Sequence, residues 1–245
     1  MRRWQGTALL RPGTLAFAGA IGTTAAHAHH AVQLMTAPTE LLVVGGNGKQ
    51  HSGTHLIIPA DAVHRIDRGA AVGTAVFLDP DSEPGRAAHQ RARIDGWNAG
   101  FGFPAHTVGE HGLDTFVTAV TTALLPAEHR TDRHPAVEAA MALLPDLVAA
   151  GTVSTRDLAG HIGLSATRLT HLFTEQVGIP LRRFILWLRL GRAIATAAAG
   201  ADLTTAAHAA GFADSAHLTR TCREIFGLPP SALSRNLRWD ITYTP

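Results

Sequence analysis

The same pattern occurs twice in this chain, as DLAGHIGLSATRLTHLFTEQVGIPLRRF over residues 157–184 and as TAAHAAGFADSAHLTRTCREIFGLPPSAL over residues 205–233. Gly163 corresponds to Gly211, and after one inserted residue Gly178 corresponds to Gly227. Each copy has a short apolar-periodic segment, a turn that contains a glycine, and a second apolar-periodic segment that ends at a glycine. This order is typical of a helix-turn-helix unit.

Short polar residues stand where each helix of the two copies should begin. Ser and Asp side chains accept hydrogen bonds from the first free backbone N–H groups of a helix. The expected N-caps are Ser154, Ser165, Asp202 and Asp214. The second helices are predicted at residues 166–176 and 215–226, and residues 180–200 predict one long helix that joins the two copies. Everything from Ala136 to about Leu237 is predicted to be helical.

The outward faces of the two second helices are polar but carry almost no acid, which suits the major groove of DNA better than a protein partner. We predict DNA contacts from Ala166, Thr167, Arg168, Thr170, His171, Ser215, Ala216, His217, Arg220 and Thr221. Arg220 is the strongest candidate to bridge O6 and N7 of a guanine. Arg168 either contacts a phosphate or covers its own helix. Arg182 and Arg183 on the joining helix are either phosphate contacts or solvated charge.

This half of the chain resembles the AraC/XylS family of bacterial transcription regulators. The resemblance covers about residues 136–237 and rests on DLAxxIGLSxxxLxxLFxxxxGxP and on AAxxAGFADxxxLxxxxxxxFGxPPS. It implies two helix-turn-helix units that enter successive major-groove segments, and a non-palindromic site of about two turns per monomer. Two departures stand out. Cys222 replaces the family's usual phenylalanine, and Leu233-Ser234 replace a tyrosine–arginine pair, so that Arg235 lies one place later than the family's arginine.

The first half shows short apolar runs between turn residues from Gly13 to Asp79, which predict consecutive antiparallel strands in a small barrel or sandwich. Apolar residues at helical spacing from Leu113 to Leu124 predict a helix that closes this half and either covers the barrel or forms a dimer contact. The polar, proline-bounded residues 126–135 are predicted to be a linker.

Histidines in the first half have a spacing that suggests a shared site. The segments HAHHAVQ (residues 27–33) and PADAVH (residues 59–64) resemble the cupin pattern HxHxxxE followed by PxxxxH. This resemblance implies a cupin-like sensor domain with a site formed by His27, His29, Gln33 and His64. Imidazoles favour Zn, Ni, Fe or Cu, but Gln33 stands in the carboxylate position and removes a charge. A metal site, a metal-free pocket for a small polar ligand, and a vestigial barrel remain the alternatives.

Composition bounds the class of protein. The chain has 245 residues, a net charge of +2, 15 histidines and a single cysteine, Cys222, which excludes a disulfide framework and is compatible with a reducing cytoplasm. No apolar run is long enough to span a bilayer, so we expect no membrane association. The charge is unevenly divided, because residues 1–133 are neutral and residues 151–235 carry +4.

We therefore expect an α+β protein of two domains. Residues 1–125 form a cupin-like antiparallel barrel with a covering helix, residues 126–135 form the linker, and residues 136–240 form an all-α domain with two helix-turn-helix units. The expected function is that of a cytoplasmic one-component transcription regulator and not an enzyme. Its partners would be promoter DNA, a small-molecule or metal effector and RNA polymerase, and it would act as a monomer or homodimer. The alternative is a metal-dependent cupin enzyme, a dioxygenase or isomerase, with an accessory helical part. Alkyl-transfer repair is disfavoured because Cys222 lies in a predicted helix core.

Overall fold

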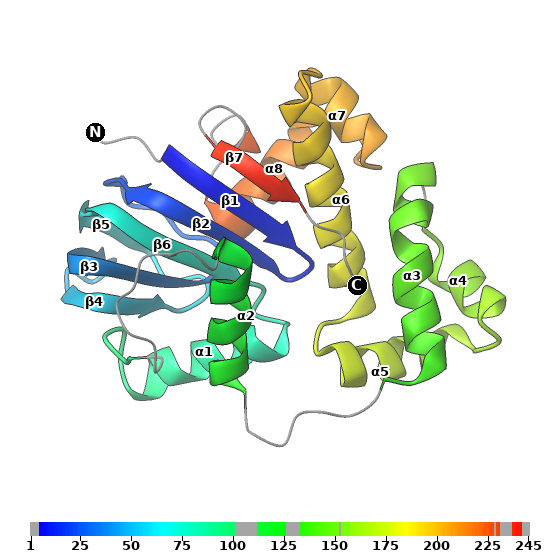
Figure 1. The fold of residues 1–245 in the computed structure, drawn as a ribbon, viewed down its shortest axis with the longest axis horizontal. Helices are drawn as coiled ribbons and strands as arrows, with labels where there is room; N and C mark the ends of the chain where they lie inside the picture. The colour runs from blue at the N-terminus through cyan, green and yellow to red at the C-terminus, as the bar shows by residue number, and fades with distance from the viewer. Residues whose placement is uncertain are drawn as a thin grey trace.

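The computed structural model describes residues 5–100, 112–125, 133–151, 153–227, 229–230 and 237–241. The strands are β1 Gln5–Arg11, β2 Thr14–Ile21, β3 Val32–Gly45, β4 Gln50–Ile58, β5 His64–Arg68, β6 Ala70–Leu78 and β7 Leu237–Ile241. The helices are α1 Glu83–Ile94, α2 Gly112–Leu124, α3 Pro135–Ala150, α4 Thr155–His161, α5 Ala166–Val177, α6 Leu181–Ala198, α7 Leu203–Ala209 and α8 Ser215–Phe226. Figure 1 shows an N-terminal sheet beside a helical C-terminal part. Most of the predicted linker lies outside the described residues.

The predicted apolar runs of the first half all lie in strands of one sheet. Its strand order is β4-β3-β6-β2-β1-β7, and β5 also pairs with β3. Apart from β7 the pairs are antiparallel. The long strand β3 changes register between Thr36 and Leu41, and beyond this point it pairs with β5 instead of β6. Because a change of register bends a strand, β3 turns the sheet toward β5.

The segment that follows β2 forms backbone hydrogen bonds with β5. Thr24 N–H donates to Ile66 O (3.1 Å), and His27 and His64 exchange two backbone hydrogen bonds of 2.9 Å each. Backbone pairing therefore runs from β5 through β3, β6 and β2 and returns to β5. This places His27 directly opposite His64.

Helices α1 and α2 cover one face of the sheet. Val76 of β6 packs in a cluster with Ala88 of α1 and Val117 of α2, whereas its neighbour Phe77 points into the opposite face, as strand alternation requires. Helix α2 was predicted, and of the two alternatives for its apolar stripe the structure has the one in which it covers the sheet. Helix α1 was not predicted, because its buried residues are only small ones, Gly85, Ala88 and Ala92.

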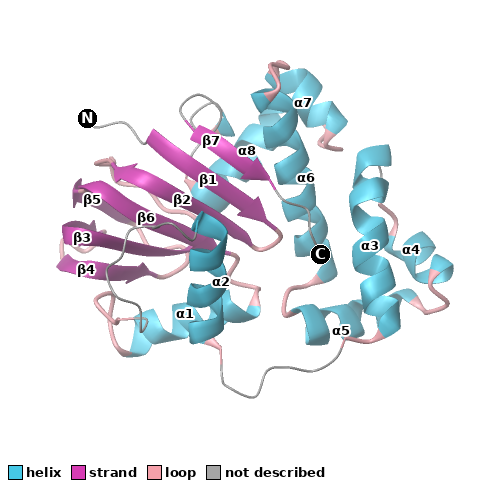
Figure 2. Cartoon of the chain, viewed as in Figure 1, coloured by secondary structure: helices cyan, strands magenta, loops and turns pink. Residues whose placement is uncertain are grey.

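The helical C-terminal part packs on the other face of the sheet (Figure 2). One buried cluster contains Met35 and Phe77 from the sheet together with Trp187 of α6 and Phe226 of α8. The rings of Phe77 and Phe226 lie 6.4 Å apart, edge to face. The two parts thus share a hydrophobic core. Among the described residues, no helix combines the length and apolar character needed to cross a bilayer.

The end of the chain returns to the sheet, which corrects one prediction. Residues 237–241 form β7, which pairs in parallel with β1 from Gly6↔Leu237 to Leu10↔Ile241. The predicted helical part of residues 136–240 therefore stops before its last residues. Such pairing depends on a neighbour more than 200 residues away, and a local pattern cannot reveal it.

Candidate functional site: two helix pairs and a histidine cluster

The two sequence repeats have the same local geometry in the structure. In the first turn Leu164 N–H donates to Ala159 O, and in the second Phe212 N–H donates to Ala207 O, both at 2.9 Å. Gly163 and Gly211 have φ of 73° and 76°, a left-handed conformation that glycine adopts without steric cost. Pairs α4–α5 and α7–α8 are therefore built by the same turn, and the inserted residue falls just before the second cap.

The predicted N-caps accept hydrogen bonds from the first turn of each helix in both pairs. Ser165 Oγ accepts from Arg168 N–H (3.2 Å), and Asp214 Oδ1 accepts from His217 N–H (2.6 Å). The hydrogen bond from His217 N–H is the main reason why the pKa of Asp214 is lowered. Ser154 and Asp202 cap α4 and α7 in the same way. Local sequence thus specifies where each helix begins.

Most of the residues predicted to contact DNA lie on the surface. Exposed side chains on α5 and α8 belong to Thr167, Arg168, Thr170, His171, Ala216, His217 and Arg220, and those of Ala166 and Ser215 are partly exposed. The prediction for Thr221 is wrong, because only 8% of this residue is exposed. The buried stripe of α8 includes Leu218, Thr221 and Cys222, and this spacing is that of a helix buried over a broad face.

Two arginines of α6 differ in their surroundings. Arg182 is exposed, as a phosphate contact requires, but the side chain of Arg183 is only 15% exposed. Arg183 Nε–H donates to Asp79 Oδ2 at 2.8 Å, and Trp187 Nε1–H donates to the same oxygen at 2.6 Å. In this conformation Arg183 is therefore not available to phosphate, and its predicted role is wrong for this arrangement.

The predicted histidines come together at one point. The ring centroids of His27 and His64 lie 4.4 Å apart, those of His29 and His64 5.0 Å, and those of His27 and His29 5.6 Å. One ring nitrogen of each lies within 4.8 Å of the others. His30 lies outside this cluster and pairs with Asp61.

Burial keeps two of these imidazoles neutral. Loss of water around His64 lowers its pKa to about 3, and the same effect lowers the pKa of His29. His29 Nε2 lies 3.0 Å from Gln33 Oε1, so Gln33 joins the cluster where a carboxylate was expected from the cupin pattern. The ring nitrogens of the cluster and Gln33 Oε1 are atoms that can act as metal ligands or hydrogen-bond acceptors.

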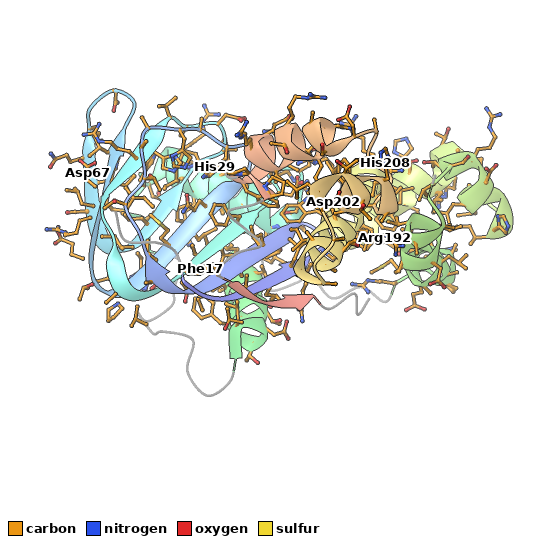
Figure 3. The ribbon with its side chains drawn as sticks, turned by 90° about the horizontal axis from the view of Figure 1, so that it is seen from above. Phe17, His29, Asp67, Arg192, Asp202 and His208 are labelled. Atoms are coloured by element: carbon orange, nitrogen blue, oxygen red, sulfur yellow. The ribbon has the colours of Figure 1, made fainter. Side chains whose placement is uncertain are left out.

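The cluster lies against the end of α8 (Figure 3). A Cβ atom on Gly227 would lie 2.7 Å from His27 Cδ2 and 3.3 Å from His29 Cδ2. Backbone N–H groups of His30 and Ala31 donate to the carbonyls of Glu224 and Ile225, at 2.7 and 3.1 Å. The segment that carries two of the histidines is therefore bonded to the last turn of a predicted DNA-reading helix.

Two features of the first half escaped sequence reasoning. Asp79, at the end of the predicted strands, is fully buried and binds α6. His51 stacks on Trp97 with centroids 4.3 Å apart, beside a surface pocket of about 490 Å³ that Lys49 and Arg93 also line. Neither contact has a local signal, since each joins residues that are far apart in sequence.

Comparison with known proteins agrees with this geometry. Residues 158–236 match a protein family described as a helix-turn-helix domain, which spans both helix pairs. This match agrees with the resemblance of residues 136–237 to the AraC/XylS regulators, and it identifies this part of the chain as a helix-turn-helix domain. A search of curated proteins found no significant match.

Several solved structures are similar to this chain over part or most of its length. A transcriptional regulator with an AraC-type DNA-binding domain from Chromobacterium violaceum is 28% identical, with 40% of this chain and 87% of that chain covered and a TM-score of 0.37. ToxT from Vibrio cholerae O395 is 13% identical, with 90% and 96% covered and a TM-score of 0.47. The C-terminal domain of AraT from Geobacillus stearothermophilus is 16% identical, with 47% and 95% covered and a TM-score of 0.41.

Proposed function

We propose that this chain is a sequence-specific, one-component regulator in which α5 and α8 each enter a major groove. The observation that carries the proposal is the recurrence of one turn geometry in α4–α5 and α7–α8, with matching caps at Ser165 and Asp214. Two such units, joined by α6, would read two segments of one DNA site.

Base contacts are assigned to the exposed N-terminal turns of the two helices. Arg220 is the residue suited to bidentate contact with guanine, because it is exposed and its guanidinium carries a fork of N–H donors. Thr167, Thr170, His171 and His217 supply shorter polar contacts. Arg182 supports binding as a phosphate contact, whereas Thr221 and Arg183 have no part in this arrangement.

The N-terminal part is assigned the sensor role. A small cupin-like barrel is proposed for it, supported by the backbone hydrogen bonds between the segment after β2 and β5, and it shares a core with the helical part. A ligand bound there can therefore bias the position of α6 and α8. The effector would be a small molecule or a metal ion. RNA polymerase would be the further partner of a regulator that activates transcription.

The test is DNA selection with the full chain, followed by footprinting and titration of the selected site. Arg220→Ala should relax base preference at one position, with little change in affinity for random DNA. The matched control is Arg93→Ala, an exposed arginine of α1, which should leave both affinities unchanged. If the protein binds no sequence selectively but consumes oxygen or isomerises a substrate when loaded with iron, the enzyme alternative replaces this proposal.

A further inference from the structure

The three clustered histidines are held in one tautomer by backbone carbonyls. Nδ1 of His27, His29 and His64 lies 2.9 Å from the carbonyl oxygens of Ala25, Ala31 and Ala62 respectively. A carbonyl oxygen only accepts, so each Nδ1 must carry the proton and each Nε2 must present a lone pair. Outer hydrogen bonds of this kind orient the histidine ligands of metal sites.

Two of the three free nitrogens meet no hydrogen-bond donor in this arrangement. His64 Nε2 is buried and has no hydrogen-bond partner among the described residues, and His64 itself is 1% exposed. His29 Nε2 faces Gln33 Oε1 at 3.0 Å, so in this orientation two acceptors meet. A cation between these atoms would satisfy all of them at once.

We infer that His27, His29 and His64 bind a divalent transition metal ion through Nε2, and that the ion holds α8 in its docked position and so strengthens DNA binding. Three imidazole nitrogens with one amide oxygen, or a water in its place, suit Zn(II) or its probe Co(II). This inference rests on the proposed function for its effect on DNA, but metal binding itself does not.

The coupling to α8 follows from where the ligands are attached. His27 and His29 belong to the segment whose N–H groups bind the last carbonyls of α8, whereas His64 belongs to β5. An ion shared by the three rings therefore joins the end of α8 to the sheet. Gly227 leaves the space for these rings.

We expect the ion to strengthen DNA binding, and not to weaken it, because the two ends of α8 make different contacts. The residues assigned to DNA, from Ser215 to Arg220, lie in its first half, and the docked residues, from Glu224 to Gly227, lie at its end. Docking holds the helix without covering the face that reads DNA. An ion that holds α8 in place before DNA binds reduces the conformational entropy that the helix loses on binding, and so raises the affinity for DNA.

The experiment uses the full chain after chelator treatment, titrated with Co(II) and with Zn(II). Visible d–d absorption should show one Co(II) per chain, and Zn(II) should displace it. Zn(II) should also slow amide exchange at His30 and Ala31. His27→Gln and His64→Gln should each weaken Co(II) binding by about tenfold or more, whereas His30→Gln, whose ring pairs with Asp61, should not.

DNA binding is then measured with and without Zn(II) on the selected site. We expect affinity to rise about fivefold or more with the ion in the wild-type protein and in His30→Gln, and not in His27→Gln, which replaces the more exposed ligand and is the safer variant for folding. Absence of Co(II) binding overturns the metal site, and binding without a gain in DNA affinity overturns the coupling. Co(II) binding with no selective DNA binding at all would instead contradict the proposed function.

Discussion

Arg183 of α6 donates its Nε–H to the carboxylate of Asp79, which is fully buried directly after β6 and lies 104 residues earlier in the chain. Trp187, one turn further along α6, donates to the same oxygen at 2.6 Å. This carboxylate therefore adds a polar contact to the hydrophobic core that joins α6 to the N-terminal sheet.

Asp79→Asn should destabilise the protein by about 3 kcal/mol, because the substitution leaves the largely buried guanidinium of Arg183 without its counter-charge. Urea denaturation would measure the loss. Asp81→Asn is the control, since Asp81 is 43% exposed and 3.9 Å from Arg183 Nε, and it should cost less than about 1 kcal/mol. Equal losses for the two variants would argue against a role for Asp79 in joining the parts.

Arg220→Ala should lose about 1–3 kcal/mol at one base position of the selected site. Arg182→Ala should weaken binding to all sequences alike and reduce the salt dependence, as loss of a phosphate contact does. Competition titrations at two salt concentrations separate these effects. A uniform loss for Arg220→Ala would remove it from the base contacts.

Stability should fall with acid because of the buried histidines. His64 has its pKa lowered to about 3, so below its ordinary value near 6.5 the unfolded chain takes up a proton that the folded chain excludes. His29 acts in the same direction. The melting temperature, measured with chelator present, should decrease as pH falls from 7.5 toward 5. The decrease should be smaller in His64→Gln, and an equal slope in both proteins would speak against a neutral buried His64.

Cys222 should be inert in the folded protein. It is fully buried, and burial raises the pKa of its thiol to about 12, so almost no thiolate is present at neutral pH. A thiol reagent should react with it only after denaturation. Fast reaction under native conditions would contradict the core position and reopen a redox role.

Gly227→Ala should cost more than Gly163→Ala. Both glycines are left-handed, with φ of 71° and 73°, but a Cβ at residue 163 meets nothing within 4 Å, whereas at residue 227 it meets the rings of His27 and His29. Gly163→Ala carries only the backbone penalty of about 1–2 kcal/mol. Gly227→Ala also displaces the two histidines, so it alone should lower the affinity for Co(II).

Sequence reasoning succeeded where a feature is local. The caps at Ser165 and Asp214, the glycine turns and the joining helix all follow from a few neighbouring residues. The closeness of His27, His29 and His64 was also predicted, from the spacing that resembles the cupin pattern. What failed depends on distant partners: β7 pairs with β1, Asp79 binds Arg183, and Thr221 is buried because α8 has a broader apolar face than its aliphatic residues suggest. Helix α1 was missed because its buried residues are too small to mark a stripe.

The central claim is that one chain reads DNA through two helix pairs on a single site. Hydroxyl-radical footprinting of the full chain on its selected fragment tests this claim most directly. We predict two protected segments about one helical turn apart, in a non-palindromic sequence, with loss of protection confined to one of them in Arg220→Ala. A single protected segment, or equal loss of both, would contradict the account.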